Sequence, residues 1–342
     1  MGNVLQTART MSDLRLSIAI NDYVHTHDIV NGIVRPIGIE LTALRMPFES
    51  AAFRFGANLE FDISEFGLSA YCARLSRPEP CPFIALPVFT SRVFRHSSIY
   101  VNEASGIANA TDLKSRTIGV PQWSQTATIY VRGYLMHDAG VPLESIAWVQ
   151  AGVDEAGRED HVELSLPKGV QLTAKPDRTL SGMLTSGEID AAITARPPKC
   201  FLDNTPGIRR LFPDYRGEER RYFERTRIFP IMHVIAIRRA VYDANPWIAR
   251  NLFDAFEQSK RASLARLSSI QTSYLPTAWG PEEMASVHQQ LFAGGEAWPY
   301  GLEANRPTLE PFLTYCHEQG VTKRKLEADE LFPRELALKI RI

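Results

Sequence analysis

The sequence predicts an α/β protein built from two lobes. The chain has 342 residues, and a single hydrophobic core rarely grows beyond about 250–300 residues, so two structural units are expected. Short apolar strands alternate with helices along the chain, an order that favours largely parallel sheets covered by helices. A second strand–helix series begins near residue 111, and a polar stretch at residues 151–170 interrupts it. These observations together indicate two α/β units.

The first series is expected to form a largely parallel sheet with its helices. Residues 14–20 (LRLSIAI) and 37–46 (IGIELTALRM) have the apolar and β-branched content of strands. A short helix is expected at residues 50–58, and residues 61–71 (FDISEFGLSAY) are interpreted as a strand, a polar turn and a helix. Residues 83–89 (FIALPVF) form the next predicted strand, which is apolar enough to be buried.

The second series starts with the clearest unit of the chain, residues 111–141. This unit contains a helix-start pattern, a strand at 116–120, a turn, and a helix that Gly140 closes. The elements expected next are a strand at 146–150, a helix at 179–189 and a strand at 190–194. They are followed by a strong strand at 228–239 and a long amphipathic helix at 246–269, whose apolar residues recur at helical spacing.

Charge and composition exclude several classes of protein. The net charge is −1 and the pI is about 6.7, which gives no electrostatic footprint for nucleic acid or an anionic membrane. No apolar run approaches the roughly 20 residues that a membrane span needs. The start "MGNVLQTART" lacks the apolar segment and cleavage site of a secretory signal, which predicts a cytoplasmic protein with reduced cysteines. The four cysteines are not spaced as zinc ligands are: Cys72, Cys81, Cys200 and Cys316.

A group of cations leads into a predicted buried strand in the stretch "SRVFRHSSIYVN", residues 91–102. Burying an unpaired cation is costly, so Arg92, Arg95 and His96 should meet water, an anionic side chain or an anionic ligand. If the stretch is extended, Arg92 and His96 share a face, and Arg95 points away towards a structural ion pair. The stretch is therefore a candidate carboxylate site, with a surface or salt-bridge role for Arg92 as the alternative.

Several local motifs resemble one protein family. "LKSRTIGVPQWSQTA" and "MLTSGEIDAAI" are similar to the second lobe of the type II periplasmic-binding-protein fold, in which the chain crosses twice between two lobes. "SRVFRHSSIYVN", "IFPIMHVIAIRR", "SIAINDYVHTHDI" and "AGREDHVEL" together resemble the 4,5-dihydroxyphthalate decarboxylase family, over residues 14–260. The resemblance implies a first lobe of residues 1–115 and 232–342, a second lobe of residues 116–231, and a ligand cleft between them.

The resemblance also implies an enzyme that removes a carboxylate from a hydroxylated aromatic diacid without an organic cofactor. An aryl carboxylate loses CO2 slowly because the electron pair left on the ring has no acceptor, and protonating the ring carbon first removes this obstacle. A deprotonated ortho or para hydroxyl assists by pushing electrons into the ring. Such a site needs a base for the phenol, a proton donor for the ring and cations for the carboxylates, roles that suit histidine and arginine.

His96 and His233 are the candidate proton carriers in this scheme. His233 lies in the otherwise apolar stretch "FPIMHVIAI" at the second crossover, where a satisfied core histidine is the alternative. Asp22 follows the first strand and could orient a histidine or accept a phenol proton, with a turn or helix-capping aspartate as the alternative. Which histidine is the acid and which is the base stays open.

The remaining candidate residues are expected to bind the substrate. In folds of this kind ligand contacts gather at the carboxyl ends of strands, which is where Tyr23, Glu65 and Arg196 are expected. Gln125 and Thr126 lie at a predicted helix N-terminus, whose free N–H groups favour an anion. The other predicted contacts are Ser91, Arg92 and, at the mouth of the cleft, Trp123.

Two other functions stay open beside the decarboxylase. One is a solute-binding protein that captures a small carboxylate without chemistry, against which the missing secretory signal argues. The other is a biosynthetic enzyme on the same scaffold, such as a pyrimidine-precursor synthase. His25 and His27 form an HxH pair, but no third ligand of matching context is present, so they are interpreted as loop residues. The expected partner is a small aromatic carboxylate, without metal, cofactor, nucleic acid or membrane, and homo-oligomerisation is left open.

Overall fold

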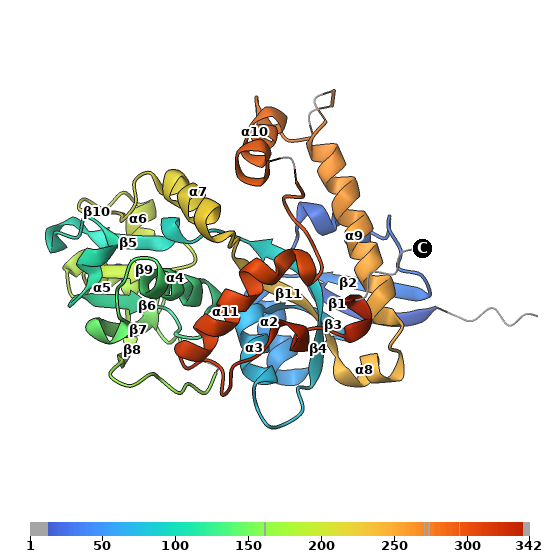
Figure 1. Cartoon of the computed structure of the whole chain (residues 1–342), viewed down its shortest axis with the longest axis horizontal. Helices are drawn as coiled ribbons and strands as arrows, with labels where there is room; N and C mark the ends of the chain where they lie inside the picture. Colours follow the sequence, from blue (N-terminus) through green and yellow to red (C-terminus); the bar gives the residue numbers. More distant parts are fainter. Residues whose placement is uncertain (1–12, 161, 270, 273, 294, 338–342) are drawn as a thin grey trace, which may run out of the picture.

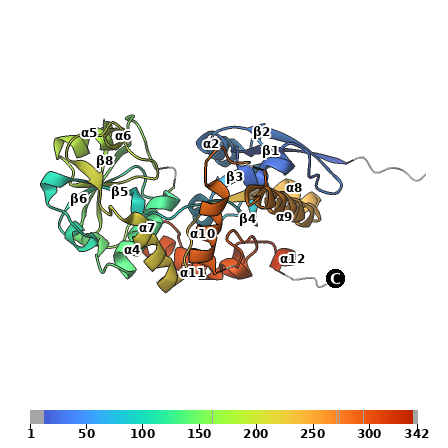
Figure 2. The ribbon, with the colours of Figure 1, turned by 90° about the horizontal axis from the view of Figure 1, so that it is seen from above.

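A computed structural model of the chain describes residues 13–160, 162–269, 271–272, 274–293 and 295–337. Its helices and strands form two α/β lobes that lie side by side, each around its own sheet (Figures 1 and 2). The α/β class and the two-lobe organisation expected from the sequence are confirmed. No helix in the described ranges is both long and apolar enough to span a bilayer.

The sheet of the first lobe has the strand order β2-β1-β3-β11-β4. β1 (Leu14–Ile20) runs parallel to both β2 (Ile39–Arg45) and β3 (Ile63–Gly67). β11 (Ile231–Arg238) returns from the second lobe and lies antiparallel between β3 and β4 (Phe83–Arg92). The first lobe is therefore assembled from both ends of the described chain.

Helices of the first lobe lie on both faces of this sheet (Figure 2), while α10 stands apart from it beside the end of α9 (Figure 1). α9 matches the predicted amphipathic helix, and its residues Ile248, Leu252 and Phe256 are fully buried at four-residue spacing. The bounds of these helices are α1 (His27–Val30), α2 (Phe48–Asn58), α3 (Leu68–Leu75), α8 (Arg239–Ala244), α9 (Ile248–Leu267), α10 (Gly280–Phe292), α11 (Arg306–Glu318) and α12 (Arg334–Ala337).

The sheet of the second lobe has the order β10-β5-β9-β6-β7-β8. Its parallel core pairs β9 with β6, β6 with β7 and β7 with β8, whereas β5 and β10 are antiparallel to their neighbours. The strands are β5 (Ile99–Asn102), β6 (Thr117–Val120), β7 (Ala147–Gly152), β8 (Gln171–Thr179), β9 (Ala191–Ile193) and β10 (Ile208–Arg210). The helices are α4 (Thr126–His137), α5 (Leu180–Ser186), α6 (Lys199–Leu202) and α7 (Tyr215–Thr226).

Two features of the second lobe differ from the sequence expectation. β5 pairs with β9 and β10, so the chain has already changed sheet before Ile99, whereas the expected first lobe extended to residue 115. β5 is as apolar as the strands before it, and nothing local marks the change of sheet. β8 was not expected as a strand because it lies at the edge of the sheet and is largely exposed, so its sequence lacks an apolar alternation.

The lobes also meet where α11 of the C-terminal segment packs on α4. A Cβ at Gly133 would lie 2.3 Å from the ring of Tyr315, so glycine allows this close approach. The buried Arg132 donates from Nε to Oε1 of Gln319 at 2.8 Å, and its guanidinium lies 3.8 Å from the ring centroid of Trp123. Trp123 is itself fully buried and donates from Nε1 to the Gln319 carbonyl at 2.8 Å. Trp123 therefore belongs to the core under α11 and does not line the mouth of the cleft.

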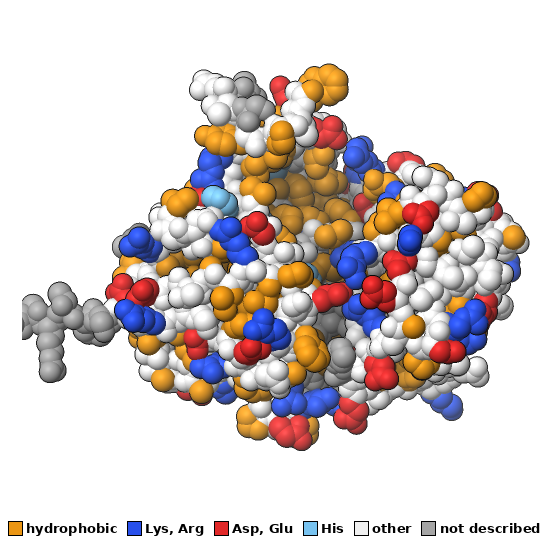
Figure 3. Space-filling view, turned by 180° about the vertical axis from the view of Figure 1, so that it is seen from behind, with side chains coloured by type: hydrophobic (Ala, Val, Ile, Leu, Met, Phe, Trp, Pro, Cys, Tyr) orange, Lys and Arg blue, Asp and Glu red, His pale blue; other side chains and the backbone are white. Residues whose placement is uncertain are grey.

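The surface is hollowed between the two lobes (Figure 3). Hydrophobic side chains gather in this hollow, and charged side chains of both signs surround it. The hollow lies between the two lobes, which is where a fold of this kind is expected to bind a ligand.

Candidate active site

A buried carboxylate, Glu65 of β3, organises a group of polar side chains. Its Oε1 accepts hydrogen bonds from the Tyr23 hydroxyl at 2.5 Å, the Thr90 hydroxyl at 2.8 Å and Nδ1 of His233 at 2.7 Å. Its Oε2 accepts from the backbone N–H of Asn21 at 3.1 Å. Burial opposes ionisation, but the hydrogen bond and charge of His233, with the bonds from Tyr23 and Asn21, hold the pKa of the Glu65 carboxyl below its usual value.

Neighbouring strands bring this group together. The end of β1 runs beside β3 in parallel, so Tyr23, just past β1, reaches Glu65. His233 of β11 pairs with Gly67 of β3 on one side and with Ser91 of β4 on the other. The β11–β4 register shifts on both sides of His233, an irregularity that bends a strand and re-aims a side chain. The sequence indicates that Glu65 follows a strand, but in the structure Glu65 lies inside β3.

The His233 ring is fixed in its plane as well as at its Nδ1 atom. The ring of Phe48, at the start of α2, stacks on it with a centroid separation of 3.5 Å and an interplanar angle of 8°. Because an ionised Glu65 accepts the Nδ1 proton, Nε2 is the nitrogen left for a ligand, and the His233 side chain is 17% exposed. The arrangement is a histidine of set tautomer with one accessible ring nitrogen.

His25 is a second polar side chain near this group, although its sequence context indicates only a loop residue. Its ring centroid lies 5.3 Å from that of Tyr23 and 5.4 Å from that of Trp298. Burial, together with the charge of Lys260, lowers the pKa of His25 to about 4. Its buried Nε2 has no hydrogen-bond partner among the described residues. An HxH spacing alone gives no signal for such a role, because only the fold places the loop beside Glu65.

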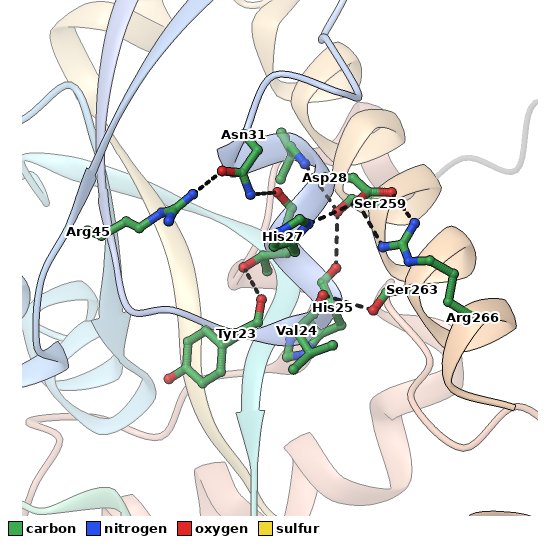
Figure 4. A network of polar contacts seen from close by, with 12 residues as sticks. Tyr23, Val24, His25, His27, Asp28, Asn31, Arg45, Ser259, Ser263 and Arg266 are labelled. Atoms are coloured by element: carbon green, nitrogen blue, oxygen red, sulfur yellow. Dashed lines mark hydrogen bonds and ion pairs between the residues drawn. The ribbon is translucent and has the colours of Figure 1, made fainter. Parts of the chain in front are cut away.

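The loop that carries Tyr23 and His25 is tied to α9 (Figure 4). The hydroxyl of Ser259 donates to the His25 carbonyl at 3.1 Å, and that of Ser263 donates to the Val24 carbonyl at 2.8 Å. Asp28, whose side chain is 3% exposed, accepts two hydrogen bonds of 2.8 Å from the guanidinium of Arg266. These bonds hold the Asp28 pKa below its usual value and fix the loop on the helix.

His96 does not join the Glu65 group in the described contacts. It lies in the 3₁₀ turn η2 (His96–Ser98), with ring centroids of Tyr134 at 4.5 Å and Tyr222 at 4.9 Å, both from second-lobe helices. Both ring nitrogens are buried without a hydrogen-bond partner among the described residues, and burial lowers the pKa of His96 to about 4. Residues 93–95 are irregular and η2 follows them, so Arg92 and His96 do not share a face as an extended chain would require.

Arg92 is a buried cation without a carboxylate partner among the described ion pairs. Its Nη1 donates to Oδ1 of Asn305 and its Nη2 to the Phe229 carbonyl, each at 2.9 Å, and its guanidinium lies 4.6 Å from the Phe229 ring centroid. Burial lowers its pKa to about 10. Arg95 points elsewhere and donates from Nη1 to the Ala195 carbonyl at 3.1 Å, which is not the ion pair expected for it. The positive charge of Arg92 is thus held by neutral acceptors and stays available to a nearby anion.

Asp22 lies outside the Glu65 group, whereas Ser91 lies within it. Asp22 is exposed, and its described hydrogen bond is from its backbone N–H to Oδ1 of Asn21, so Glu65 and not Asp22 orients the histidine. Ser91 lies opposite His233 in the β4–β11 pair and hydrogen-bonds to Tyr23, which places it in the group.

Two helix N-termini meet beside His233. Gln125 caps α4, and the Thr126 hydroxyl lies 2.8 Å from the hydroxyl of Ser69, in the first turn of α3. Gly67, the residue before α3, is the strand partner of His233. The Thr126 hydroxyl thus links the first turns of α3 and α4, and the positive ends of both helix dipoles lie close to the histidine.

Arg196 lies where the sequence placed it, just past β9, and is 73% exposed. One of its guanidinium nitrogens lies 3.6 Å from Oε1 of Glu49, in the first turn of α2 in the opposite lobe. The same oxygen lies 3.2 Å from Nη1 of Arg158, which follows β7. An ion-pair group therefore connects the lobes beside Phe48.

Two curated relatives match most of their length to this chain, while no protein-family model matches it. A 4,5-dihydroxyphthalate decarboxylase of Comamonas testosteroni is 35% identical over 323 residues, which are 94% of this chain and 97% of the relative. A protein of the same name from Pseudomonas putida is 40% identical over 208 residues, or 60% of this chain and 80% of the relative.

Two solved structures that match over nearly the whole chain are of binding proteins. The periplasmic aliphatic sulphonate binding protein SsuA of Escherichia coli superposes with a TM-score of 0.54 at 13% identity, covering 95% of this chain and 99% of that one. A putative sulfonate-binding SsuA of Methylobacillus flagellatus gives a TM-score of 0.56 at 13% identity, covering 94% and 92%. At this identity the likeness shows the fold alone, and it confirms the binding-protein-like fold expected from the sequence motifs.

Proposed function

The chain belongs to the 4,5-dihydroxyphthalate decarboxylase family, and from this premise we propose that it is a carboxy-lyase that removes one carboxylate from a hydroxylated aromatic diacid. The observation that carries the proposal is the pairing of His233 with the buried Glu65 at 2.7 Å. This pair supplies a proton carrier where two lobes of a binding-protein-like fold face each other. The names of the relatives make 4,5-dihydroxyphthalate the first substrate to test.

The proposed reaction needs one proton at the ring and no redox step. A phenolate para or ortho to the departing carboxylate pushes electrons into the ring, and Nε2–H of His233 gives its proton to the carbon that bears that carboxylate. The bond between this carbon and the carboxylate then breaks, CO2 leaves, and the bonding pair returns to the ring and restores aromaticity. His233 regains a proton from the phenol of the next substrate or from water.

The neighbours of His233 have defined tasks in this scheme. Glu65 holds the Nδ1 proton and stabilises the imidazolium while His233 is charged. Burial and the charge of Glu65 raise the pKa of Tyr23, so its hydroxyl stays a hydrogen-bond donor to that carboxylate. Phe48 keeps the imidazole in one plane, which directs Nε2 at a single position.

Binding of the substrate carboxylates is assigned to positively charged or polarised groups of the first lobe and of α4. Arg92 contributes a buried charge, and the linked N-termini of α3 and α4, at Ser69 and Thr126, contribute the positive ends of two helix dipoles. His96 is not assigned a proton-transfer step, because burial and the charge of Arg225 disfavour its charged form.

Incubation of the purified protein with hydroxylated phthalates and benzoates, with measurement of released CO2, tests the proposal. We expect CO2 in a one-to-one ratio with the hydroxybenzoate product and no release from phthalate, which lacks the phenol. Because binding proteins share this fold, ligand capture without chemistry is the second candidate function. Tight binding of dihydroxyphthalate without CO2 would support capture and overturn the decarboxylase. The cytoplasmic location stays a prediction.

A further inference from the structure

Glu49 places one carboxylate between two arginines of the opposite lobe. Its Oε1 lies 3.2 and 3.3 Å from the two terminal nitrogens of Arg158 and 3.6 Å from Nη2 of Arg196. The two arginines follow β7 and β9, which flank β6 in the parallel part of the second sheet, so both lie at the edge where those strands end. Glu49 faces them from the first turn of α2, directly after Phe48.

We propose that Arg158 and Arg196 bind the carboxylate that the aromatic diacid retains, and that Glu49 occupies their carboxylate position in the unliganded protein. The inference rests on the proposed function for the identity of the ligand. In this arrangement the substrate displaces Glu49, and the retained carboxylate bridges the two guanidinium groups.

The charges and distances of this group favour displacement. Two guanidinium groups share one carboxylate, so the three side chains together carry a net positive charge. The distances to Glu49 are longer than the roughly 2.7–2.9 Å of strong charge-assisted hydrogen bonds. The Glu49 side chain is 53% exposed, and ion pairs at such positions contribute little to stability. A ligand carboxylate that reaches both arginines with better geometry can therefore replace it.

The ion-pair group is linked to His233 through Phe48, and the two carboxylates of a phthalate stand on neighbouring ring carbons. Phe48 stacks on His233, and Glu49 is the next residue, so its Cα lies about 3.8 Å from that of Phe48. Arg158 is directed by a second bond, because its Nη2 donates to Oε1 of the largely buried Gln122 at 2.9 Å. A ring whose retained carboxylate lies between the arginines would turn its other carboxylate towards His233.

The test compares 3,4-dihydroxybenzoate with its uncharged amide by calorimetry on the whole protein. Removing the competing carboxylate in Glu49→Gln should tighten binding of the acid about 3- to 10-fold and leave the amide unchanged. Arg158→Gln and Arg196→Gln should each weaken binding of the acid about 10-fold or more, again without effect on the amide. Glu60→Gln is the matched control, because Glu60 forms a similarly exposed pair with Arg54 of α2.

The outcomes separate displacement from a structural bridge. If Glu49 only braces the two lobes, Glu49→Gln will bind the acid as the wild type does or more weakly, and either result overturns the proposal. Tightening of the acid and the amide alike, or arginine variants that bind the acid normally, also overturns it. Calorimetry needs no turnover, so a failure here with CO2 release intact leaves the decarboxylase assignment in place. If calorimetry gives the expected changes but no CO2 is released, the carboxylate site stands and the decarboxylase assignment fails.

Discussion

His233 and His96 are two largely buried histidines in opposite surroundings. The Nδ1 atom of His233 lies 2.7 Å from a buried carboxylate, and an aromatic ring stacks on its imidazole. His96 lines a small cavity with Tyr130, Tyr134 and Tyr222, and within the described part of the chain neither of its ring nitrogens has a hydrogen-bond partner. The two buried rings therefore differ in their partners: His233 hydrogen-bonds to a carboxylate, whereas burial disfavours the charged form of His96.

The largest expected effect is on kcat, when His233, the histidine paired with Glu65, is replaced. His233→Asn keeps much of the shape and the bond to Glu65 but cannot transfer a proton, so kcat should fall at least about 100-fold while the substrate still binds. Steady-state kinetics and calorimetry measure the two quantities. His96→Asn is the matched control and should keep kcat within about threefold. A larger loss at His96 than at His233 would reverse the comparison.

The second prediction concerns how the free energy of unfolding depends on pH through His96. The pKa of His96 is lowered from 6.5 to about 4, so the unfolded chain binds more protons between these pH values and the free energy of unfolding falls as the pH falls through that range. Phe at position 96 has nothing to protonate. Between pH 7.5 and 5, His96→Phe should gain about 2 kcal/mol in unfolding free energy relative to the wild type. Urea unfolding at both pH values measures this, and equal changes in the two proteins would contradict it.

The smallest effect is expected where the loop of Tyr23 and His25 is fixed to α9. Arg266→Gln removes the bidentate bond to Asp28, so the loop should loosen and kcat should fall about 3- to 10-fold, with Arg266→Lys restoring part of it. Arg250→Gln breaks an exposed ion pair with Asp254 on the same helix and is the control. Kinetics identical in the Arg266 and Arg250 variants would remove the loop from the site.

The candidate site was only partly predictable, because its residues meet through sheet register. Tyr23, Glu65 and His233 were selected as polar side chains in or after apolar strands. The bond between Glu65 and His233 joins residues 168 positions apart, and only the β3–β11 pairing brings them together. The sequence favours Asp22 over Glu65 as the carboxylate that orients a histidine, yet Asp22 is exposed while Glu65 is buried. His25 carries no local signal at all.

The sequence by itself determined the α/β class, the two strand–helix series and most element positions, because apolar periodicity and helix-end residues act locally. Its motifs also pointed to the family that the relatives confirm. Only the tertiary structure decided that β5 joins the second sheet, that Trp123 lies in the core, and that His96 lies apart from the Glu65 group. Those outcomes depend on which strands pair and which helices pack, and such long-range contacts leave no periodic trace in the residues that make them.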